Sequence, residues 1–329
     1  MTSLFFKSIL VISLLVVGTL PFKTANDLVA KANPSCDQTN QRTISLRVEN
    51  KAGIAVDNFR PEDLSLLENK SSREILKLER RTHEPLSVAI LIDTSASQER
   101  TLAGTKIAAQ KFVELILNSN KDRAAVVSFT GEATIEQDLT NDLTKLRAAI
   151  DRVKLVLPAG YLGGGIVMGR NLPNRTQMLA GSTAIWDTIR TTVDGIQPTA
   201  DSRRLIVLLT DGEDTISKTK LRDAIEHAAT NDLAIFSIGI ADEKYVGLNR
   251  DSLKRLSEET GGGVFFPKKA ADLDSIFSEL AQALQSRYVL SYCAASSKPA
   301  VKPPKIQIEV KNPQVLQSNV RLSYPHYSL

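Results

Sequence analysis

The sequence predicts an α/β fold, a doubly wound sheet that is inserted in or flanked by a small β-sandwich-like domain. From Leu86 onward, apolar runs alternate with amphipathic segments, which is typical of parallel strands covered by helices on both faces. On either side of this region, short apolar segments are separated by turn residues, which favours short strands. The chain of 329 residues is long enough for about two domains.

Residues 33–85 are predicted to form an N-terminal β segment. Ile44, Leu46 and Val48 alternate with other residues, as in a strand with one buried face. Two further apolar segments, Leu64 to Leu67 and Ile75 to Leu78, follow and are separated by a turn cluster at Asn69.

Residues 86–286 are predicted to form the α/β domain, with a largely parallel sheet. The expected strands are Leu86 to Ile92, Ala124 to Phe129, Leu205 to Leu209, Ala234 to Ile238 and Gly263 to Phe266. The expected helices are Thr105 to Leu117, Asp142 to Val153, Ala184 to Val193, Lys218 to Thr230, Asp251 to Glu259 and Leu273 to Gln285.

Residues 287–329 return to strands, at Tyr288 to Tyr292, Ile306 to Val310 and Val320 to Tyr324. Neither terminal segment has enough strands to be independently stable, so we expect the C-terminal segment to pair with residues 33–85. The α/β domain is then an insertion in one small β domain.

The first 32 residues are predicted to be a signal peptide. Lys7 precedes the apolar run Ser8 to Leu20, which is short for a bilayer span but suits a signal-peptide core. Cleavage near Ala30-Lys31-Ala32 and cleavage after Ala25 both fit the pattern. We therefore expect a secreted, periplasmic or cell-envelope protein without a stable membrane span after cleavage, the alternative being an uncleaved anchor.

Two cysteines, Cys36 and Cys293, lie far apart in the sequence. After export they can form one disulfide that joins the two β segments, and two buried thiols are the alternative. The 41 basic and 37 acidic residues give a net charge of +4 without a long basic block. This distribution gives little support for nucleic-acid binding.

Five polar residues are candidates for a metal site. Asp93, Ser95 and Ser97 directly follow the first predicted strand of the α/β domain, Asp211 follows the third, and Thr183 precedes a predicted helix. Loops at the carboxyl ends of parallel strands converge, so we expect these side chains to meet there.

Two carboxylates and three hydroxyls suit a hard divalent cation such as Mg²⁺, with Ca²⁺ and Mn²⁺ as alternatives. Carboxylates offset the charge of the ion, whereas hydroxyls add none. A coordination position left to water can therefore accept an acidic side chain of a protein partner, which predicts binding without chemical conversion.

At these residues the chain resembles the von Willebrand factor type A (VWA) domain. The metal-ion-dependent adhesion site (MIDAS) of that family has the pattern Asp-x-Ser-x-Ser with a separate Thr and a separate Asp. Asp93, Ser95, Ser97, Thr183 and Asp211 match it, and Thr210-Asp211-Gly212 resembles the usual Thr-Asp-Gly. The resemblance implies a Rossmann-like sheet with a cation at its carboxyl edge. The flanks resemble a bacterial group of exported VWFA-related proteins.

Two stretches depart from the family pattern. Ala96 stands where the family often has Gly, and a long stretch, Leu155 to Ala180, precedes Thr183. This stretch is expected either to shape partner choice near the metal or to be an ordinary surface loop. Asp214 is expected either to support the metal ligands or to be an ordinary loop acid. A remnant site, with the hydroxyls acting only as turn and helix caps, is the alternative to metal binding.

No enzyme is predicted. His83, His227 and His326 lack metal-ligand spacing, and the chain has no phosphate-binding Gly-x-x-x-x-Gly-Lys-Ser/Thr motif and no evident nucleophile with its base. The sequence therefore predicts a metal-dependent protein-binding module of the adhesion type. The alternative function is structural or assembly-related, in the cell envelope, with a non-essential metal site.

Overall fold

A computed structural model describes residues 36–50, 55–56, 59–82, 84–117, 120–156, 161–162, 165–166, 181–196, 202–240, 247–268, 272–284, 286–295, 302–313 and 320–327. The chain divides into two units, Met1–Cys36 and Asp37–Leu329. The predicted signal peptide, residues 1–32, lies outside the described residues.

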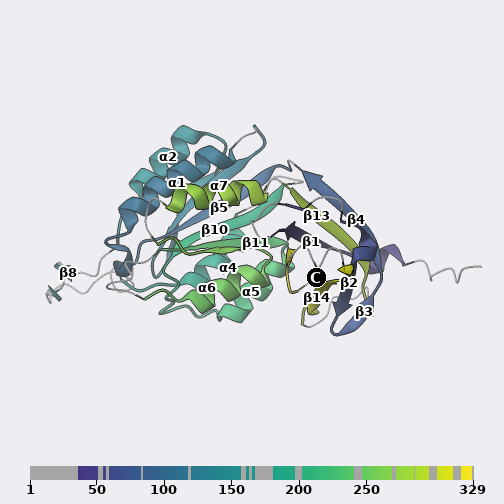
Figure 1. Cartoon of the computed structure of the whole chain (residues 1–329). Helices are drawn as coiled ribbons and strands as arrows, with labels where there is room; N and C mark the ends of the chain where they lie inside the picture. Colours follow the sequence, from purple (N-terminus) through teal and green to yellow (C-terminus); the bar gives the residue numbers. More distant parts are fainter. Residues whose placement is uncertain are drawn as a thin grey trace, which may run out of the picture. The chain divides into compact units, whose positions relative to one another are not determined.

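The α/β part is built on a six-stranded sheet with the strand order β12-β11-β10-β5-β6-β7 (Figure 1). Its first five strands in that order are parallel, and the edge strand β7 runs antiparallel to β6. The bounds are β5 Leu86–Asp93, β6 Arg123–Phe129, β7 Ala133–Thr140, β10 Arg203–Thr210, β11 Leu233–Gly239 and β12 Val264–Phe265. The prediction of a doubly wound α/β sheet is therefore confirmed.

Strand β7 was not among the predicted strands. Its sequence, Ala-Thr-Ile-Glu-Gln-Asp-Leu-Thr, has no buried residue, because the strand lies at the edge of the sheet. Ala133, Ile135 and Leu139 lie on one face of the strand, but Gln137 interrupts it, so the apolar alternation on which sequence-based assignment depends is incomplete. By contrast, all eight residues of β5 are buried, and its apolar run is easy to recognise.

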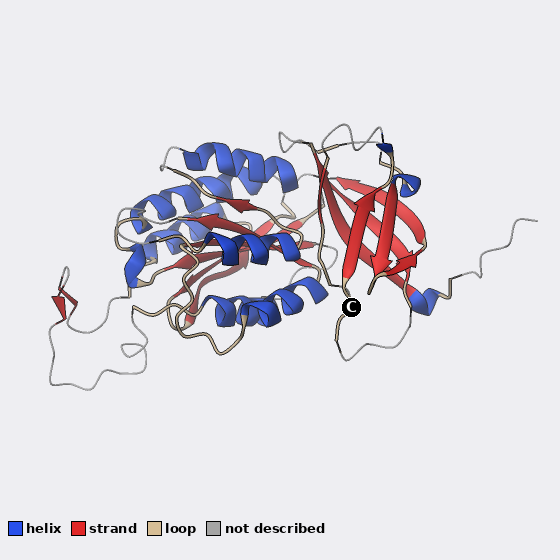
Figure 2. Cartoon of the chain, turned by 60° about the horizontal axis from the view of Figure 1, so that its bottom comes forward, coloured by secondary structure: helices blue, strands red, loops and turns tan. Residues whose placement is uncertain are grey.

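In the described part of the chain, helices cover both faces of the sheet, as Figures 1 and 2 show. One face carries α1 Leu102–Ile116, α2 Leu143–Arg152 and α7 Asp272–Leu284, and the other carries α4 Ile185–Gly195, α5 Leu221–Thr230 and α6 Arg250–Glu259. Each face buries its own apolar core. Phe112 and Phe277 pack together in the first core, with ring centroids 5.0 Å apart, and Trp186 lies in the second.

The β part consists of two further sheets. One has the order β15-β1-β13-β4, and the other has the order β14-β2-β3. The bounds are β1 Gln41–Glu49, β2 Leu64–Glu68, β3 Ser71–Arg73, β4 Ile75–Thr82, β13 Ser286–Cys293, β14 Ile306–Val310 and β15 Arg321–Ser323. Leu46, Leu66 and Tyr292 belong to one buried cluster that both sheets share.

Strand pairing joins the two ends of the sequence. β1 comes from the N-terminal segment, yet it lies between β13 and β15 of the C-terminal segment. β2 likewise pairs with β14. Strand pairs therefore connect segments that flank the α/β part, while the domain bounds given above remain a prediction.

Both cysteines are disulfide-bonded, which excludes the alternative of two free thiols. Because the chain contains two cysteines, the bond joins Cys36 to Cys293. In the chain-entropy model, closing so long a loop stabilises the fold by about 5 kcal/mol.

Within the described residues, no helix is both long and apolar enough to cross a membrane.

The turn after α6 requires glycine at position 262. A Cβ atom added to Gly262 would lie 1.9 Å from the carbonyl oxygen of Ile235, whereas one added to Gly104 in α1 would meet no atom within 4 Å. We therefore expect Gly262→Ala to lower the free energy of unfolding by about 2–3 kcal/mol or more, because backbone must move. Gly104→Ala should raise it by up to about 1 kcal/mol through helix propensity.

Urea unfolding of the two variants beside the unchanged protein tests this contrast. Equal midpoints for Gly262→Ala and the unchanged protein would show that the close approach to Ile235 is wrong.

Candidate metal centre

The first part of the site is the loop that follows β5. Asp93 ends this strand and is almost fully buried, and its Oδ1 accepts a hydrogen bond of 2.9 Å from the amide of Ser95. Ser95 Oγ lies 3.0 Å from Ser97 Oγ, so the two hydroxyls stand side by side. The loop thus gathers one carboxylate and two hydroxyls within a few residues.

The second part comes from the neighbouring strand. β10 pairs with β5 up to Leu209 opposite Ile92, so Asp211 follows its strand next to Asp93. Thr210 Oγ1 donates a hydrogen bond of 2.5 Å to Asp93 Oδ2. Asp211 is fully buried, and its Oδ1 accepts from the amide of Glu213.

Burial and the nearby charge of Asp211 raise the pKa of Asp93 to about 7, although hydrogen bonds from Ser95 and Thr210 oppose this rise. Among the described residues, no Lys, Arg or His forms an ion pair with either carboxylate. Two adjacent buried acids without a positive partner are electrostatically unfavourable, and a bound cation would remove the repulsion between them.

Gln98 is a site residue that sequence reasoning missed. It is buried, and its Nε2 donates a hydrogen bond of 2.9 Å to Asp211 Oδ2. Its Oε1 accepts a hydrogen bond of 2.7 Å from Thr101 Oγ1, so the amide orientation is fixed. The available signal was its position directly after Ser97 in the motif, because a polar side chain there begins on the same turn as the ligands.

Hydrogen bonds join the loop of Thr183 to the loop that follows β10. The amide of Thr183 donates to Thr215 Oγ1 at 2.8 Å, and its carbonyl accepts from the amide of Thr215 at 2.8 Å. Thr215 lies four residues after Asp211, so this exchange fixes the Thr183 loop to the loop of the second acid. Sequence reasoning also missed Thr215.

Asp214 has a defined structural role in the same region. Its Oδ1 accepts hydrogen bonds from the amide of Ile185 at 2.7 Å and from Ser217 Oγ at 2.6 Å. Ile185 begins α4, so Asp214 provides a carboxylate cap where the helix dipole favours negative charge. Of the two expectations for Asp214, indirect support of the site is the one that these contacts favour.

The structure therefore brings Asp93, Ser95, Ser97 and Asp211 together by direct contacts or shared neighbours, and it fastens the loop of Thr183 to that of Asp211. Their role as ligands remains a prediction. The donor set fits a hard cation, since it consists of oxygen atoms and includes two negative charges. Among the described residues, no group of three or more His, Cys, Asp or Glu side chains could hold a metal, so the hydroxyls are essential to this candidate.

The two ends of the long stretch before Thr183 are hydrogen-bonded to each other, and the first end is also bonded to the loop after β5. Val156 donates its amide to the carbonyl of Thr94, and Gly181 donates to the carbonyl of Val156. Between them lies the short hairpin of β8 Tyr161–Leu162 and β9 Gly165–Ile166. Residues 157–160, 163–164 and 167–180 lie outside the described residues, so the expected effect of this stretch on partner choice stays a prediction.

A doubly wound sheet with acids and hydroxyls at the carboxyl ends of neighbouring strands defines a class of cation-binding α/β modules. The von Willebrand factor type A domain model matches residues 87–279, more than half of the chain. The chain therefore belongs to the von Willebrand factor type A domain family. No curated protein matches it in sequence.

Several solved structures are similar to this chain. BatB from Bacteroides thetaiotaomicron is 16% identical with a TM-score of 0.46, and the match covers 60% of this chain and 98% of that protein. A von Willebrand factor type A protein from Catenulispora acidiphila is 13% identical with a TM-score of 0.46, and the match covers 87% of this chain and 73% of that protein. Proximal thread matrix protein 1 from the mussel byssus, with a zinc-occupied MIDAS motif, is 16% identical with a TM-score of 0.49. The match covers 64% of this chain and 49% of that protein.

The role of Gln98 can be tested with a matched pair of substitutions. Gln98→Met keeps the length of the side chain but leaves the buried Asp211 Oδ2 without this donor. We expect it to lower the free energy of unfolding of the metal-free protein by about 1–3 kcal/mol, the cost of an unsatisfied buried carboxylate oxygen.

The control is Gln110→Met, because Gln110 Nε2 makes the same type of hydrogen bond, 2.8 Å to Asp151 Oδ1, on the solvent-exposed surface. That substitution should change the free energy of unfolding by less than about 0.5 kcal/mol. Urea unfolding in the presence of a chelator measures both. Similar effects of the two substitutions would contradict a special role for Gln98.

Proposed function

We propose that this chain is an exported, non-enzymatic protein-binding module that captures its partner through a divalent cation, Mg²⁺ in the first place. The observation that carries the proposal is the adjacency of two buried carboxylates, Asp93 and Asp211, beside the hydroxyls of Ser95 and Ser97. Membership of the von Willebrand factor type A family supports it.

The cation would be held by the five residues predicted from the sequence, namely Asp93, Ser95, Ser97, Thr183 and Asp211. Mg²⁺ dehydrates reluctantly and usually keeps several water ligands, and one such position can pass to an acidic side chain of the partner. Ile216 supplies an exposed apolar side chain close by, since its amide donates to the carbonyl of Thr183. A partner would thus meet a charged centre with an apolar edge.

The proposal places the protein outside the cytoplasm, as a secreted, periplasmic or cell-envelope protein. Support comes from the apolar run Ser8 to Leu20 after Lys7 and from the disulfide-bonded state of both cysteines. Disulfides persist in oxidising compartments and are rare in the cytosol.

Cation binding is the first quantity to measure. We expect isothermal titration calorimetry of the chelator-stripped protein to show saturable binding of Mg²⁺, with Mn²⁺ and Ca²⁺ titrated for comparison. Asp93→Ala and Asp211→Ala should each abolish the signal, because the remaining carboxylate cannot offset the charge of the ion. Asp223→Ala, which removes an exposed acid from α5, should leave it unchanged.

Circular dichroism of the same samples shows whether each variant is folded. If the folded, unsubstituted protein binds none of the three cations, the metal-dependent function is wrong and a structural role in the envelope gains support.

Capture of an acidic group can be tested with matched peptides. We expect immobilised peptides that carry a glutamate to bind the Mg²⁺-loaded protein, and the same peptides with glutamine to bind at least tenfold more weakly, because only a carboxylate can enter the cation's coordination shell. Surface plasmon resonance in Mg²⁺ and in EDTA measures this difference. Equal binding of both peptide sets, or binding that persists in EDTA, would argue against cation-mediated capture.

A further inference from the structure

A small cavity lies at the other end of the central sheet, where β10 and β11 begin. Its volume is about 20 Å³, enough for one water molecule or an ion of similar size. Its lining combines the amino ends of these strands with strands β1, β13 and β15 of the β part. Among the described residues, its lining contains Arg47, Arg203, Arg204 and Arg287, with Asp232 as the only acid.

Arg47 is buried in this lining with part of its guanidinium unsatisfied. Nη2 donates to the carbonyl of Gly262 at 3.1 Å and to Ser323 Oγ at 3.3 Å. Nε lies 2.7 Å from Glu49 Oε1 but is not aligned for a hydrogen bond, and Nη1 has no acceptor among the described residues. The guanidinium also stacks on Phe236, 4.9 Å from the ring centroid. At least one buried N–H donor therefore remains available.

Arg203 is buried without a carboxylate partner among the described residues. Its Nη1 donates to the carbonyl of Leu284, the last residue of α7, at 3.1 Å. Burial, followed by the charges of Arg287 and Arg47, lowers the pKa of Arg203 to about 9. The three guanidinium groups are thus close enough to repel one another.

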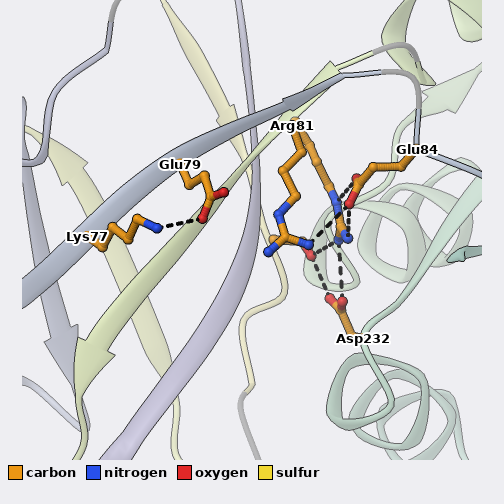
Figure 3. A network of polar contacts seen from close by, with 7 residues as sticks. Lys77, Glu79, Arg81, Glu84 and Asp232 are labelled. Carbon is orange, nitrogen blue, oxygen red and sulfur yellow. Dashed lines mark hydrogen bonds and ion pairs between the residues drawn. The ribbon is translucent and has the colours of Figure 1, made fainter. Parts of the chain in front are cut away.

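The acids near the cavity are already engaged. Glu84 Oε2 lies 2.6 Å from Arg287 Nε, and Asp232 Oδ2 lies 3.4 Å from Arg287 Nη1, within the network that Figure 3 shows around Glu84 and Asp232. Asp232 Oδ1 also accepts a hydrogen bond of 2.7 Å from Ser45 Oγ. Arg204 donates to the carbonyls of Val193 and Asn231, so it too has no carboxylate partner in the described part of the chain. The lining therefore carries an excess of positive charge.

We infer that this cavity binds a small inorganic anion, chloride, between Arg47 and Arg203. A water molecule would accept hydrogen bonds from the free donors but would leave the positive charge in place. A halide is little larger than water, accepts several N–H donors and offsets one charge. The site lies at the opposite end of the sheet from the candidate metal centre and does not depend on it.

The direct test is a crystal of the protein soaked in sodium bromide, because bromide replaces chloride and scatters anomalously. We expect an anomalous peak in the cavity, within hydrogen-bond distance of Arg47 and Arg203. A cavity without a peak, or one with only water density, would overturn the inference.

The second test is thermal unfolding with EDTA, at equal ionic strength, in sodium chloride and in sodium methanesulfonate. Chloride should raise the midpoint by about 2–4 °C, as expected for a weak ligand of the folded state. Arg203→Met should remove this difference. Arg152→Met, which removes an exposed arginine that also donates to a backbone carbonyl, should retain it.

The two tests do not both depend on the Arg203→Met variant. If Arg203→Met does not fold, the bromide peak and the salt comparison on the unsubstituted protein still decide. A bromide peak without any chloride-dependent change in the midpoint would indicate an adventitious ion only and would overturn the inference.

Discussion

The repulsion between Asp93 and Asp211 is the constraint that the loops at the carboxyl ends of the parallel strands must satisfy. Their strands are neighbours, so the parallel register places both acids in the same buried region. Neutral donors hold them there, namely the amides of Ser95 and Glu213, the hydroxyl of Thr210 and the amide group of Gln98. Hydrogen bonds orient the carboxylates but do not cancel their charge. A hard cation requires a rigid, negatively charged pair of this kind. The need to hold the two acids in place also explains why so many hydrogen bonds join the surrounding loops.

The two ends of the parallel strands have opposite electrostatic character. At the carboxyl end, Asp93 ends β5 and Asp211 follows β10, whereas Arg203 and Arg204 begin β10 at the amino end. These arginines donate to carbonyls at or near the carboxyl ends of α4, α5 and α7, where the helix dipole favours positive charge. The alternation of helix and strand explains this contact, because β10 follows α4 and β11 follows α5 in the chain.

Much of the fold could be predicted because buried strands such as β5 and β10 are continuous apolar runs. The candidate ligands could be predicted because Asp93, Ser95 and Ser97 follow such a run directly. Strand β7 could not, since its residues are not buried and Gln137 interrupts its short apolar face. Gln98 and Thr215 act through contacts with residues far away in the sequence, and only Gln98 has a local signal, its position directly after Ser97. The arginine-lined cavity depends on the meeting of distant strands, and scattered arginines give no sequence signal for it.

Strands β4 and β13 are hydrogen-bonded neighbours from Ser286 opposite Thr82 to Leu290 opposite Leu78 and beyond. In topological terms they form a β-hairpin, and the entire α/β part occupies the place of its turn. Loop-closure entropy rises only with the logarithm of the number of residues enclosed, and a folded insert fixes its own two ends beside each other. The entropy cost of pairing β4 with β13 therefore depends little on the number of residues between them. The β part can hold the α/β part as an inserted domain without any change in its own strand order.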